Sequence, residues 1–225
     1  MVSSPASFWA ALDAGDRAAL LRAATRVPLA ADRQFLAQGE GSDHLVVLLD
    51  GWVKVVAQSQ AGYRALLALR GPGELLGEQA SVENGRRSAT LVTATAAELL
   101  HLPASRFHVL ARARPGIAAA LEQTLVRRLR EADAQRAGIT EPVPARLAAL
   151  LLDLVDRCGL PEPHGPGRRL GLSLSQDDLA GLLLTSRRTV SRVLEQWRAQ
   201  GWIVTGRQSL AIRAPDRLAE QTSND

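Results

Sequence analysis

The spacing of apolar positions changes along the chain, and each change marks a different class of element. Within the first 35 residues, the stretch SFWAALDAGDRAALLRAAT carries a helical pattern. From about Phe35 to about Pro103, short runs of β-forming residues such as HLVVLLDGWVKVVAQS and SATLVTATAAELLHL alternate with glycine turns. Turn signals about every ten residues are typical of an antiparallel sandwich or barrel. We therefore expect a β domain in the first half of the chain.

The helical period returns between about Pro115 and Ala137, with a proline near the first turn. The apolar residues of this stretch follow one another at steps of three or four: Ala118, Leu121, Leu125, Leu129 and Ala132. Charged residues flank this narrow stripe, which is the pattern of a coiled-coil seam. The helix either packs on its own β domain or pairs with a second copy of the chain. Its length and its narrow seam favour the homodimer.

Two prolines and a glycine in GITEPVPAR interrupt the helical pattern, and we interpret this segment as a hinge. Beyond it, ARLAALLLDLVDRC predicts a helix, GLPEPHGPGRR a loop and LGLSL a short strand. The chain is thus expected to be an α+β protein in three parts. These are a β domain over 1–114, a dimerisation helix over 115–137 and a mostly helical domain over 138–225.

Two short helical patterns lie within residues 173–204 and are separated by a break at Leu184-Thr185. Ser175 and Asp178 resemble a capping box that opens the first helix. The apolar residues of the second helix fall on one face: Val190, Val193, Leu194 and Trp197. Two helices joined by a tight turn predict a helix-turn-helix. After Gly201, WIVTGRQSLAIR predicts a β-hairpin that turns at residues 205–207.

The polar face of the second helix carries arginines near its N-terminal end, which suits a recognition helix in the DNA major groove. Arginine can donate two hydrogen bonds to guanine, and hydroxyls near a helix start can donate to phosphates. The alternative is a helical hairpin that only packs, which would leave the one-sided charge unexplained. The candidate DNA-binding residues are Ser186, Arg187, Arg188, Thr189, Ser191, Arg192 and, on the hairpin, Arg207.

Charge and composition support this interpretation. The formal net charge is +4, and six arginines stand against a single acid, Glu195, between Leu183 and Arg213. Such a concentration of positive charge is typical of a phosphate-binding surface. Cys158 is the only cysteine, which excludes an intrachain disulfide, and the four histidines show no metal-ligand spacing. No nucleophile–base spacing supports an enzyme using Cys158 or a histidine such as His164.

The chain has no apolar run of about 18 residues, which a membrane-spanning helix would need. Its first residues do not have the pattern of a secretory signal. We therefore expect a cytoplasmic protein that neither spans nor binds a membrane. We also expect that it requires no metal or cofactor.

Three stretches together resemble the cyclic-AMP receptor protein/fumarate-nitrate regulator (Crp/Fnr) family. TSRRTVSRVLEQWRAQGWI is similar to the family's recognition helix, and GEGSDHLVVLLDGWVKV to the entry of its β-roll. GELLGEQASVENGRRSATLVTA is similar to its phosphate-binding cassette. The resemblance runs from about residue 8 to about residue 220. It implies a dimeric transcription regulator with an N-terminal cyclic-nucleotide-binding β-roll (jelly roll), a dimerisation helix and a C-terminal winged helix-turn-helix.

The cassette resemblance also assigns ligand-binding roles. A short helix after Gly77 would offer backbone N–H groups to an anion, and Glu78 would bind the ribose 2′-hydroxyl. Nine positions later, Arg87 would bind the cyclic phosphate, with the hydroxyl of Ser88 beside it. Arg86 would point the opposite way in an extended segment. The alternative role for Arg87 is a salt bridge, for which Glu78 is the obvious partner.

Several positions depart from the family pattern. Gln79 and Ser81 stand where the cassette has leucines, so the cassette helix would be looser or the pocket would take a different ligand. On the long helix, Ala132 and Asp133 stand where cyclic-AMP sensors have a Thr-Ser pair that reaches the base. Asp133 can still accept from a base amino group. The effector is therefore cyclic AMP or another nucleotide, and the alternative is another effector or activity without a ligand.

In the DNA-binding half, Arg188 replaces a glutamate, which predicts guanine rather than cytosine at one base pair. Leu184 replaces a turn glycine, and we expect a different turn shape because a positive φ at leucine is strained. His44 and His101 have no evident partner, and we expect no haem. The implied partners are double-stranded DNA with a pseudo-palindromic operator and a second copy of the chain. Whether the loop 159–167 contacts RNA polymerase stays open.

Overall fold

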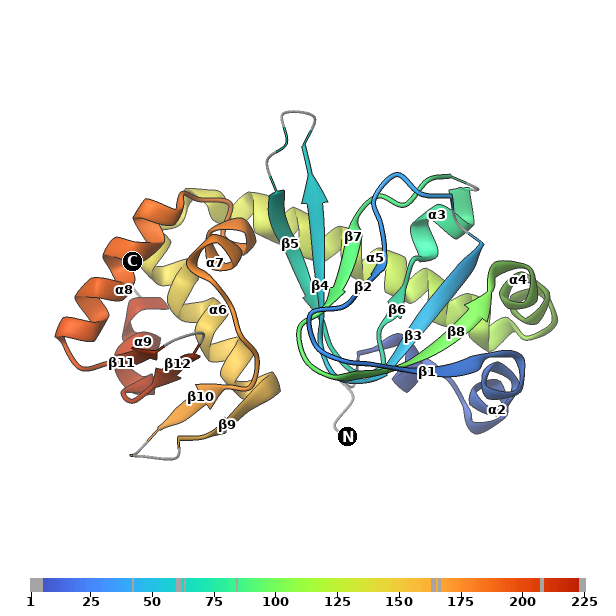
Figure 1. The fold of residues 1–225 in the computed structure, drawn as a ribbon, viewed down its shortest axis with the longest axis horizontal. Helices are drawn as coiled ribbons and strands as arrows, with labels where there is room; N and C mark the ends of the chain where they lie inside the picture. The colour runs from blue at the N-terminus through green and yellow to red at the C-terminus, as the bar shows by residue number, and fades with distance from the viewer. Residues whose placement is uncertain are drawn as a thin grey trace. The chain divides into compact units, whose positions relative to one another are not determined.

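The computed structural model describes residues 6–41, 43–59, 62, 64–83, 85–162, 165, 167–206 and 209–222. The chain divides into two compact units, Met1–Ala132 and Asp133–Asp225. The division falls inside one continuous helix, α5 (Pro115–Ala137), which begins and ends where the sequence predicts (Figure 1). Within the described ranges, no helix is both long and apolar enough to cross a membrane.

Two antiparallel four-stranded sheets form the centre of the first unit (Figure 1). One sheet has the strand order β1-β8-β3-β6 and the other the order β2-β7-β4-β5. The strands are β1 (Thr25–Leu29), β2 (Gln34–Leu36), β3 (His44–Asp50), β4 (Val53–Gln58), β5 (Arg64–Arg70), β6 (Leu75–Leu76), β7 (Thr90–Thr93) and β8 (Ala97–Pro103). The predicted antiparallel β domain is confirmed.

Strand β3 explains why the apolar run in HLVVLLD is nearly continuous. Leu45 and Val47 face a cluster made with the helices, whereas Val46 and Leu48 face the second sheet. A strand covered on both faces needs apolar residues at every position, because successive side chains point to opposite faces. Each large apolar side chain buried here contributes roughly 1.5–3 kcal/mol.

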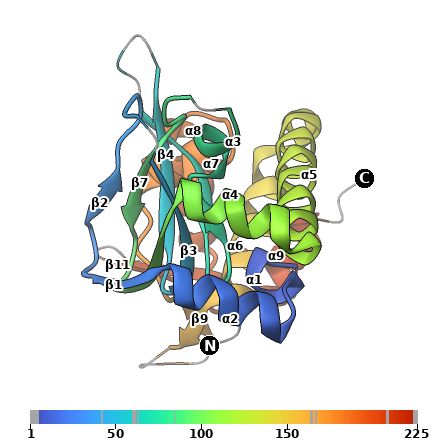
Figure 2. The same ribbon diagram turned by 90° about the vertical axis from the view of Figure 1, so that its right-hand side faces the viewer.

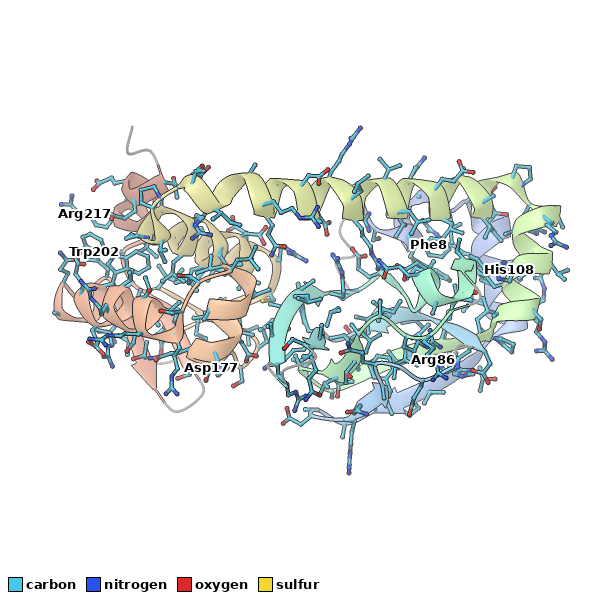
Figure 3. The ribbon with its side chains drawn as sticks, turned by 90° about the horizontal axis from the view of Figure 1, so that it is seen from above. Phe8, Arg86, His108, Asp177, Trp202 and Arg217 are labelled. Atoms are coloured by element: carbon cyan, nitrogen blue, oxygen red, sulfur yellow. The ribbon has the colours of Figure 1, made fainter. Side chains whose placement is uncertain are left out.

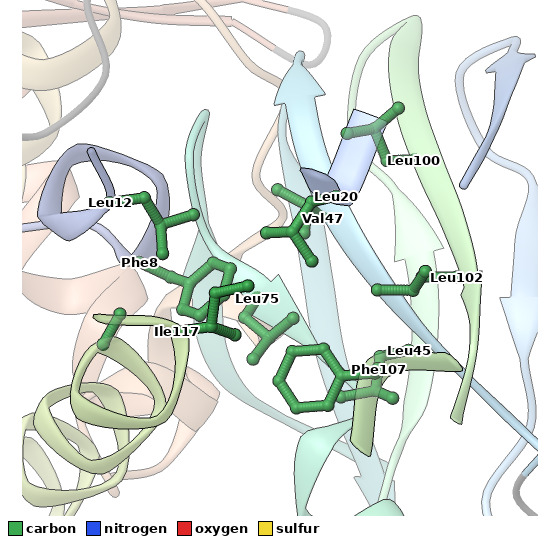
Figure 4. Packing of buried hydrophobic residues seen from close by; sticks show 11 residues of the cluster. Phe8, Leu12, Leu20, Leu45, Val47, Leu75, Leu100, Leu102, Phe107 and Ile117 are labelled. Atoms are coloured by element: carbon green, nitrogen blue, oxygen red, sulfur yellow. The ribbon is translucent and has the colours of Figure 1, made fainter. Parts of the chain in front are cut away.

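Helices cover the outer face of the β1-β8-β3-β6 sheet (Figure 2). They are α1 (Phe8–Ala11), α2 (Ala14–Ala23), α4 (Ala104–Ala113) and the first part of α5. Phe8 and Phe107, which are fully buried, meet with ring centroids 6.4 Å apart in the cluster between the helices and the sheet (Figure 4). The sequence patterns predicted α1 and α2 but missed α4, which begins directly after Pro103 at the end of β8.

Helix α5 presents two adjacent stripes. Ile117, Ala120 and Thr124 are buried against the first unit. The predicted seam lies beside this stripe: Leu121 and Leu125 are half-buried, and Leu129 is 61% exposed. The helix therefore packs on its own β domain, and Leu121 of the seam also packs against that core, whereas Leu129 is largely exposed. Pairing of the seam with a second copy stays a prediction.

The second unit contains the last turn of α5 followed by a short 3-10 turn (Gly138–Thr140) in the predicted hinge. Its helices are α6 (Val143–Cys158), α7 (Gln176–Leu182), α8 (Arg187–Ala199) and α9 (Pro215–Thr222). A sheet of order β11-β12-β10-β9 completes it, built from β9 (Gly159–Pro161), β10 (Arg168–Leu170), β11 (Ile203–Gly206) and β12 (Ser209–Ile212). Trp197 of α8 is the largest fully buried side chain.

Four sequence expectations for this unit need correction. The segment GLPEPHGPGRR, expected to be a loop, contributes β9 and the first two residues of β10. The short strand lies at Arg168–Leu170 rather than over LGLSL, because its backbone pairs with β9 and β12 on either side. The predicted hairpin exists as the antiparallel pair β11–β12, but Thr205 and Gly206, which were expected in its turn, belong to β11. Arg207, the third residue of the predicted turn, lies outside the described ranges. Helix α9 was not predicted.

Candidate functional site

Arg87 lies between the short helix α3 (Glu78–Glu83) and β7, and its side chain is buried, with 4% exposed. Nη1 donates to the Gly77 carbonyl at 3.0 Å, and Nη2 donates to the His44 carbonyl at 2.7 Å. Nε is buried without a hydrogen-bond partner. Backbone carbonyls satisfy donors but do not neutralise a cation. Burial lowers the pKa of Arg87, and the negative charges of Asp43, Glu78 and Glu40 oppose that shift.

Arg86 differs from Arg87 as the alternation of an extended segment predicts. Its side chain is exposed, and Nη1 donates to the Gly39 carbonyl at 2.7 Å (Figure 3). Arg86 also forms an isolated β-bridge with Gly41. The two adjacent arginines therefore occupy different environments, and Arg87 is the buried one.

Gly77 sits where the chain enters α3, with φ of +77°. A Cβ atom at this position would lie 2.2 Å from Nη1 of Arg87. The left-handed backbone favours glycine here, and a Cβ atom would in addition displace the guanidinium of Arg87. The predicted binding residues Gly77 and Arg87 are thus in direct contact.

Glu78 is the first residue of α3, and 1% of it is exposed. Its Oε1 forms an ion pair with Nη1 of Arg128, whereas its Oε2 is buried without a hydrogen-bond partner. Arg128 also donates to the Leu75 carbonyl and lies 3.7 Å from Glu74. The alternative salt bridge between Arg87 and Glu78 is not among the ion pairs of the described residues. The partner of Glu78 is Arg128 of α5.

Arg128 is the residue that the sequence patterns missed. It belongs to a chain of alternating charges that continues through Glu74 and Arg127, which are 2.9 Å apart, to Glu131 and Arg70, which are 2.7 Å apart. Its sequence signal is the pair of arginines in RRL on an otherwise apolar helix face. That signal does not identify the partner, which comes from a segment about 50 residues away.

Two further cassette residues contact one another. Ser88 is exposed, and its hydroxyl donates to Oε1 of Gln79 at 2.8 Å. Ser81 is buried, and its hydroxyl lies 3.1 Å from Nε2 of His108 on α4. The polar residues at 79 and 81 therefore have side-chain partners, and α3 forms despite the missing leucines.

Asp133 is exposed on α5 and pairs with Arg136 at 3.4 Å. It is the first residue of the second unit, whereas Gly77, Glu78, Arg87 and Ser88 belong to the first. Its assignment to the pocket stays a prediction.

His44 and His101 have partners, contrary to the expectation from sequence. Their rings stack with centroids 4.0 Å apart, and Nδ1 of His44 hydrogen-bonds Oδ1 of Asp43. The hydrogen bond from His44 is the main cause that lowers the pKa of Asp43, and burial is the main cause that lowers the pKa of His101. Among the described residues, no group of three or more His, Cys, Asp or Glu side chains is arranged to hold a metal ion.

Cys158 is half-buried at the end of α6, and its Sγ donates to the Leu154 carbonyl at 3.0 Å. Burial raises the pKa of the thiol, which disfavours the nucleophilic thiolate. The candidate base His164 lies outside the described residues.

The turn between α7 and α8 keeps the shape that we expected leucine to prevent. Leu184 has φ of +49°. Its N–H donates to the Gly181 carbonyl, and the Thr185 N–H donates to the Ala180 carbonyl. These bonds form a Schellman motif, which normally has glycine at this position. The expectation of a different turn is therefore wrong: the helix end is satisfied, and Leu184 takes the strained conformation.

Helix α7 opens with the predicted capping box of Ser175 and Asp178. Asp177, the residue directly before Asp178, is labelled in Figure 3. Helix α8 is capped by Ser186, whose hydroxyl accepts from the Thr189 N–H at 3.1 Å and lies 2.8 Å from the Thr189 hydroxyl. The predicted apolar face of α8 is buried: Val190, Val193, Leu194 and Trp197.

The opposite face of α8 presents its arginines to solvent. Arg187 lies 3.7 Å from Asp177 of α7, and Ser191 donates to Glu195 at 2.8 Å. Arg188 and Arg192 are exposed, and no ion pair of the described residues involves either one. The helix therefore offers two uncompensated cations next to its N-terminal end, where a DNA backbone or base edge could accept their hydrogen bonds.

Comparisons with known proteins identify both halves of the chain. Residues 26–114 match the cyclic nucleotide-binding domain, and residues 145–221 match the Crp-like helix-turn-helix domain. The chain is 32% identical to the CRP-like cAMP-activated global transcriptional regulator of Mycobacterium tuberculosis over 82% of each chain. It is 36% identical to the cyclic AMP receptor protein of Thermus thermophilus over 81% of each chain.

The fold is similar to a solved structure of the c-di-GMP responsive global regulator CLP of Xanthomonas campestris, with a TM-score of 0.74 and 25% identity. That match covers 89% of this chain and 99% of CLP. Dimers are typical of these regulators. The chain belongs to the Crp/Fnr family of transcription regulators, with a cyclic nucleotide-binding domain followed by a DNA-binding helix-turn-helix domain.

Proposed function

We propose that this chain is a homodimeric regulator whose binding to a pseudo-palindromic operator is controlled by cyclic AMP or a closely related nucleotide held by Arg87 and Glu78. The observation that carries the proposal is the pair of incomplete hydrogen-bonding groups in the cassette. Nε of Arg87 is a buried donor without a partner, and Oε2 of Glu78 is a buried acceptor without one. A cyclic phosphate supplies the acceptor and a ribose 2′-hydroxyl supplies the donor.

The chemistry of the two residues suits the two ends of that ligand. Arg87 is held by carbonyls that fix its orientation without neutralising it, so an anion gains a charge-assisted hydrogen bond. Glu78 is oriented by Arg128, which leaves one oxygen for the ribose. Because Arg128 is part of α5, a ligand on Glu78 would act on the same helix that carries the dimer seam.

The DNA half of the proposal assigns α8 to the major groove. Arg188 and Arg192 would read base edges, while Ser186 and Thr189 would contact phosphates. Arg187 and Ser191 complete the proposed surface, together with Arg207 outside the described residues. RNA polymerase is included as a partner of the DNA-bound dimer. Joint footprinting of the regulator and polymerase on a target promoter tests that part.

A second candidate keeps DNA binding and changes the effector. Ala132 has no base-binding hydroxyl, and Gln79 already binds Ser88, the proposed neighbour of the phosphate. The Xanthomonas campestris relative is described as responsive to c-di-GMP, a different nucleotide. Under this candidate, another molecule occupies the β-roll or the protein is active without one.

Calorimetry separates the two candidates. Purified chain is titrated with cyclic AMP, cyclic GMP and c-di-GMP, and the melting temperature is recorded with each ligand. A ligand at 100 times its Kd stabilises the folded state by about 2.7 kcal/mol. Heat and stabilisation with a cyclic mononucleotide support the first candidate. No response to either mononucleotide at millimolar concentration rejects it in favour of the second.

A further inference from the structure

The C-terminal end of α7 is held by side chains from both sides of the hinge. A helix leaves its last four carbonyls without intrahelical partners. In α7, the Ala180 carbonyl accepts from the Thr185 N–H, and the Gly181 carbonyl accepts from the Leu184 N–H. The carbonyls of Leu182 and Leu183 remain. The Leu182 carbonyl accepts from Nε2 of Gln135 at 3.0 Å, and the Leu183 carbonyl accepts from Nη1 of Arg146 at 2.6 Å.

These two donors come from elements that the hinge separates. Gln135 lies in the last turn of α5, and Arg146 lies in the first turn of α6. Between them run the 3-10 turn Gly138–Thr140 and residues 141–142. A Cβ at Gly138 would lie 3.9 Å from Cδ of Arg146, so the start of the hinge also lies close to the arginine. All of these residues belong to the second unit.

The two bonds have different consequences for motion. Arg146 and α7 are both beyond the hinge, so their bond fixes the packing of the helix-turn-helix on α6. Gln135 precedes the hinge, so its bond to Leu182 joins the helix-turn-helix directly to α5. A change of the hinge dihedral angles that moved α7 away from α5 would have to break the Gln135 bond.

We infer that Gln135 and Arg146 form a clamp that positions the recognition helix relative to the end of α5, and that the clamp sets the separation of the two recognition helices in the dimer. Both are positioning residues, because neither is proposed to touch DNA. The inference rests on the proposed dimeric DNA binding but not on the identity of the effector.

If the clamp acts in this way, its loss should change the preference of the dimer for one spacing of the half-sites. A change in local stability alone would not affect that preference. A dimer reads two half-sites, so a fixed separation of its recognition helices favours one spacing of those half-sites. A single half-site makes no such demand. Loss of the clamp should therefore weaken binding to the full operator and leave binding to one half-site unchanged.

The test uses the full-length chain and an operator selected from a random DNA pool. Affinity is measured for the operator, for a version with one base pair inserted between its half-sites, and for a single half-site. Gln135→Ala removes one neutral hydrogen bond, which corresponds to a loss of about three- to tenfold in affinity for the operator. The preference of the variant for the native spacing should shrink by a similar factor.

Three further variants sharpen the test. Gln135→Glu replaces the donor by an acceptor of the same size and should weaken operator binding at least as much. Arg146→Met keeps the apolar stem without the donor and should also reduce the spacing preference. Arg136→Ala is the matched control, since Arg136 is exposed on the same turn and pairs with Asp133. Its spacing preference should equal that of the wild type.

Each outcome decides the inference. Unchanged operator affinity and spacing preference in both Gln135 variants would overturn the clamp while leaving DNA binding intact. Equal losses on the operator and the single half-site would also overturn it, because they would indicate a local folding defect. A wild-type chain that binds no DNA would overturn the proposed function, and the clamp with it.

Discussion

At the scale of single residues, the two arginines of ENGRRSATL show how neighbours in sequence take separate roles. Arg86 is exposed and donates to a backbone carbonyl, whereas Arg87 is buried and its Nε has no hydrogen-bond partner. In the same cassette, Oε2 of Glu78 is likewise buried without a partner. A buried unpaired polar group costs about 1–3 kcal/mol, and more when it is charged. Under the proposed function, a ligand that completes both groups would recover that free energy on binding.

Replacing Arg87 by alanine should weaken cyclic-nucleotide binding by about 100-fold or more, because the ligand phosphate would be buried without its cation. Isothermal titration calorimetry measures this loss directly. Arg86→Ala is the control and should keep wild-type affinity, since the Arg86 side chain is exposed. Equal affinity losses in the two variants would contradict the assignment of the phosphate to Arg87.

Leu184→Gly should raise the free energy of unfolding by about 0.5–1 kcal/mol, because it relieves a left-handed leucine in a Schellman turn that glycine normally completes. Thr185→Gly, one residue later and not in a left-handed conformation, should lower the free energy of unfolding by a similar amount. Urea unfolding monitored by circular dichroism compares both with the wild type. A destabilised Leu184→Gly variant would show that the side chain contributes more than its backbone strain costs.

At the scale of elements, α8 and α5 each have a buried face and a face available for binding. Both faces of α8 could be predicted, because a 3.6-residue period places Val190, Val193 and Trp197 opposite the arginines. The bounds of α5 could be predicted as well, whereas its role as a dimer seam stays a prediction. The stripe of Ile117, Ala120 and Thr124 beside it was missed, because two of these residues are small or polar and their burial depends on the sheet below.

Arg188→Glu should change the base preferred at one position of each half-site from guanine to cytosine, because a carboxylate accepts from cytosine N4. The discrimination at that position should be about 1–3 kcal/mol. Selection from a random DNA pool reports it. Arg198→Glu makes the same charge change farther along α8, where Arg198 bonds Thr205, and should weaken affinity without changing the base. The same preferred base for Arg188→Glu and wild type would remove Arg188 from base recognition.

Leu129→Asp should convert the proposed dimer into monomers, since a carboxylate at a paired apolar seam would be buried without a partner. Leu129 is largely exposed in the single chain, so the fold of each copy should survive. Gln123→Asp places the same charge on the side of α5 away from the seam and should stay dimeric. Sedimentation velocity distinguishes the two, and a dimeric Leu129→Asp variant would place the interface elsewhere.

At the scale of the whole molecule, the order of domains and most of their elements could be predicted from sequence. Period and turn signals located the β domain, the long helix and the helix-turn-helix. The contacts that give those elements function could not be predicted from them. Arg128 meets Glu78 across about 50 residues of chain, and Gln135 meets Leu182 across 47. Such pairs depend on how elements pack, and no local pattern carries that information.

Under the proposed function, these long-range contacts would link the two sites. A ligand on Glu78 would act on α5 through Arg128, and the end of α5 would act on the helix-turn-helix through Gln135. Coupling between two binding sites is reciprocal in free energy, so we expect DNA to raise the affinity for the effector by the same factor by which the effector raises the affinity for DNA.

The proposed control of DNA binding is tested most directly by fluorescence anisotropy, which measures operator affinity across a titration of cyclic AMP and cyclic GMP at one fixed salt concentration. We predict that one of these nucleotides tightens operator binding by roughly 5- to 150-fold, the range typical of allosteric coupling. We also predict that Arg87→Ala retains the ligand-free affinity and loses the response. Operator affinity that is the same with and without either nucleotide would contradict control through Arg87 and Glu78.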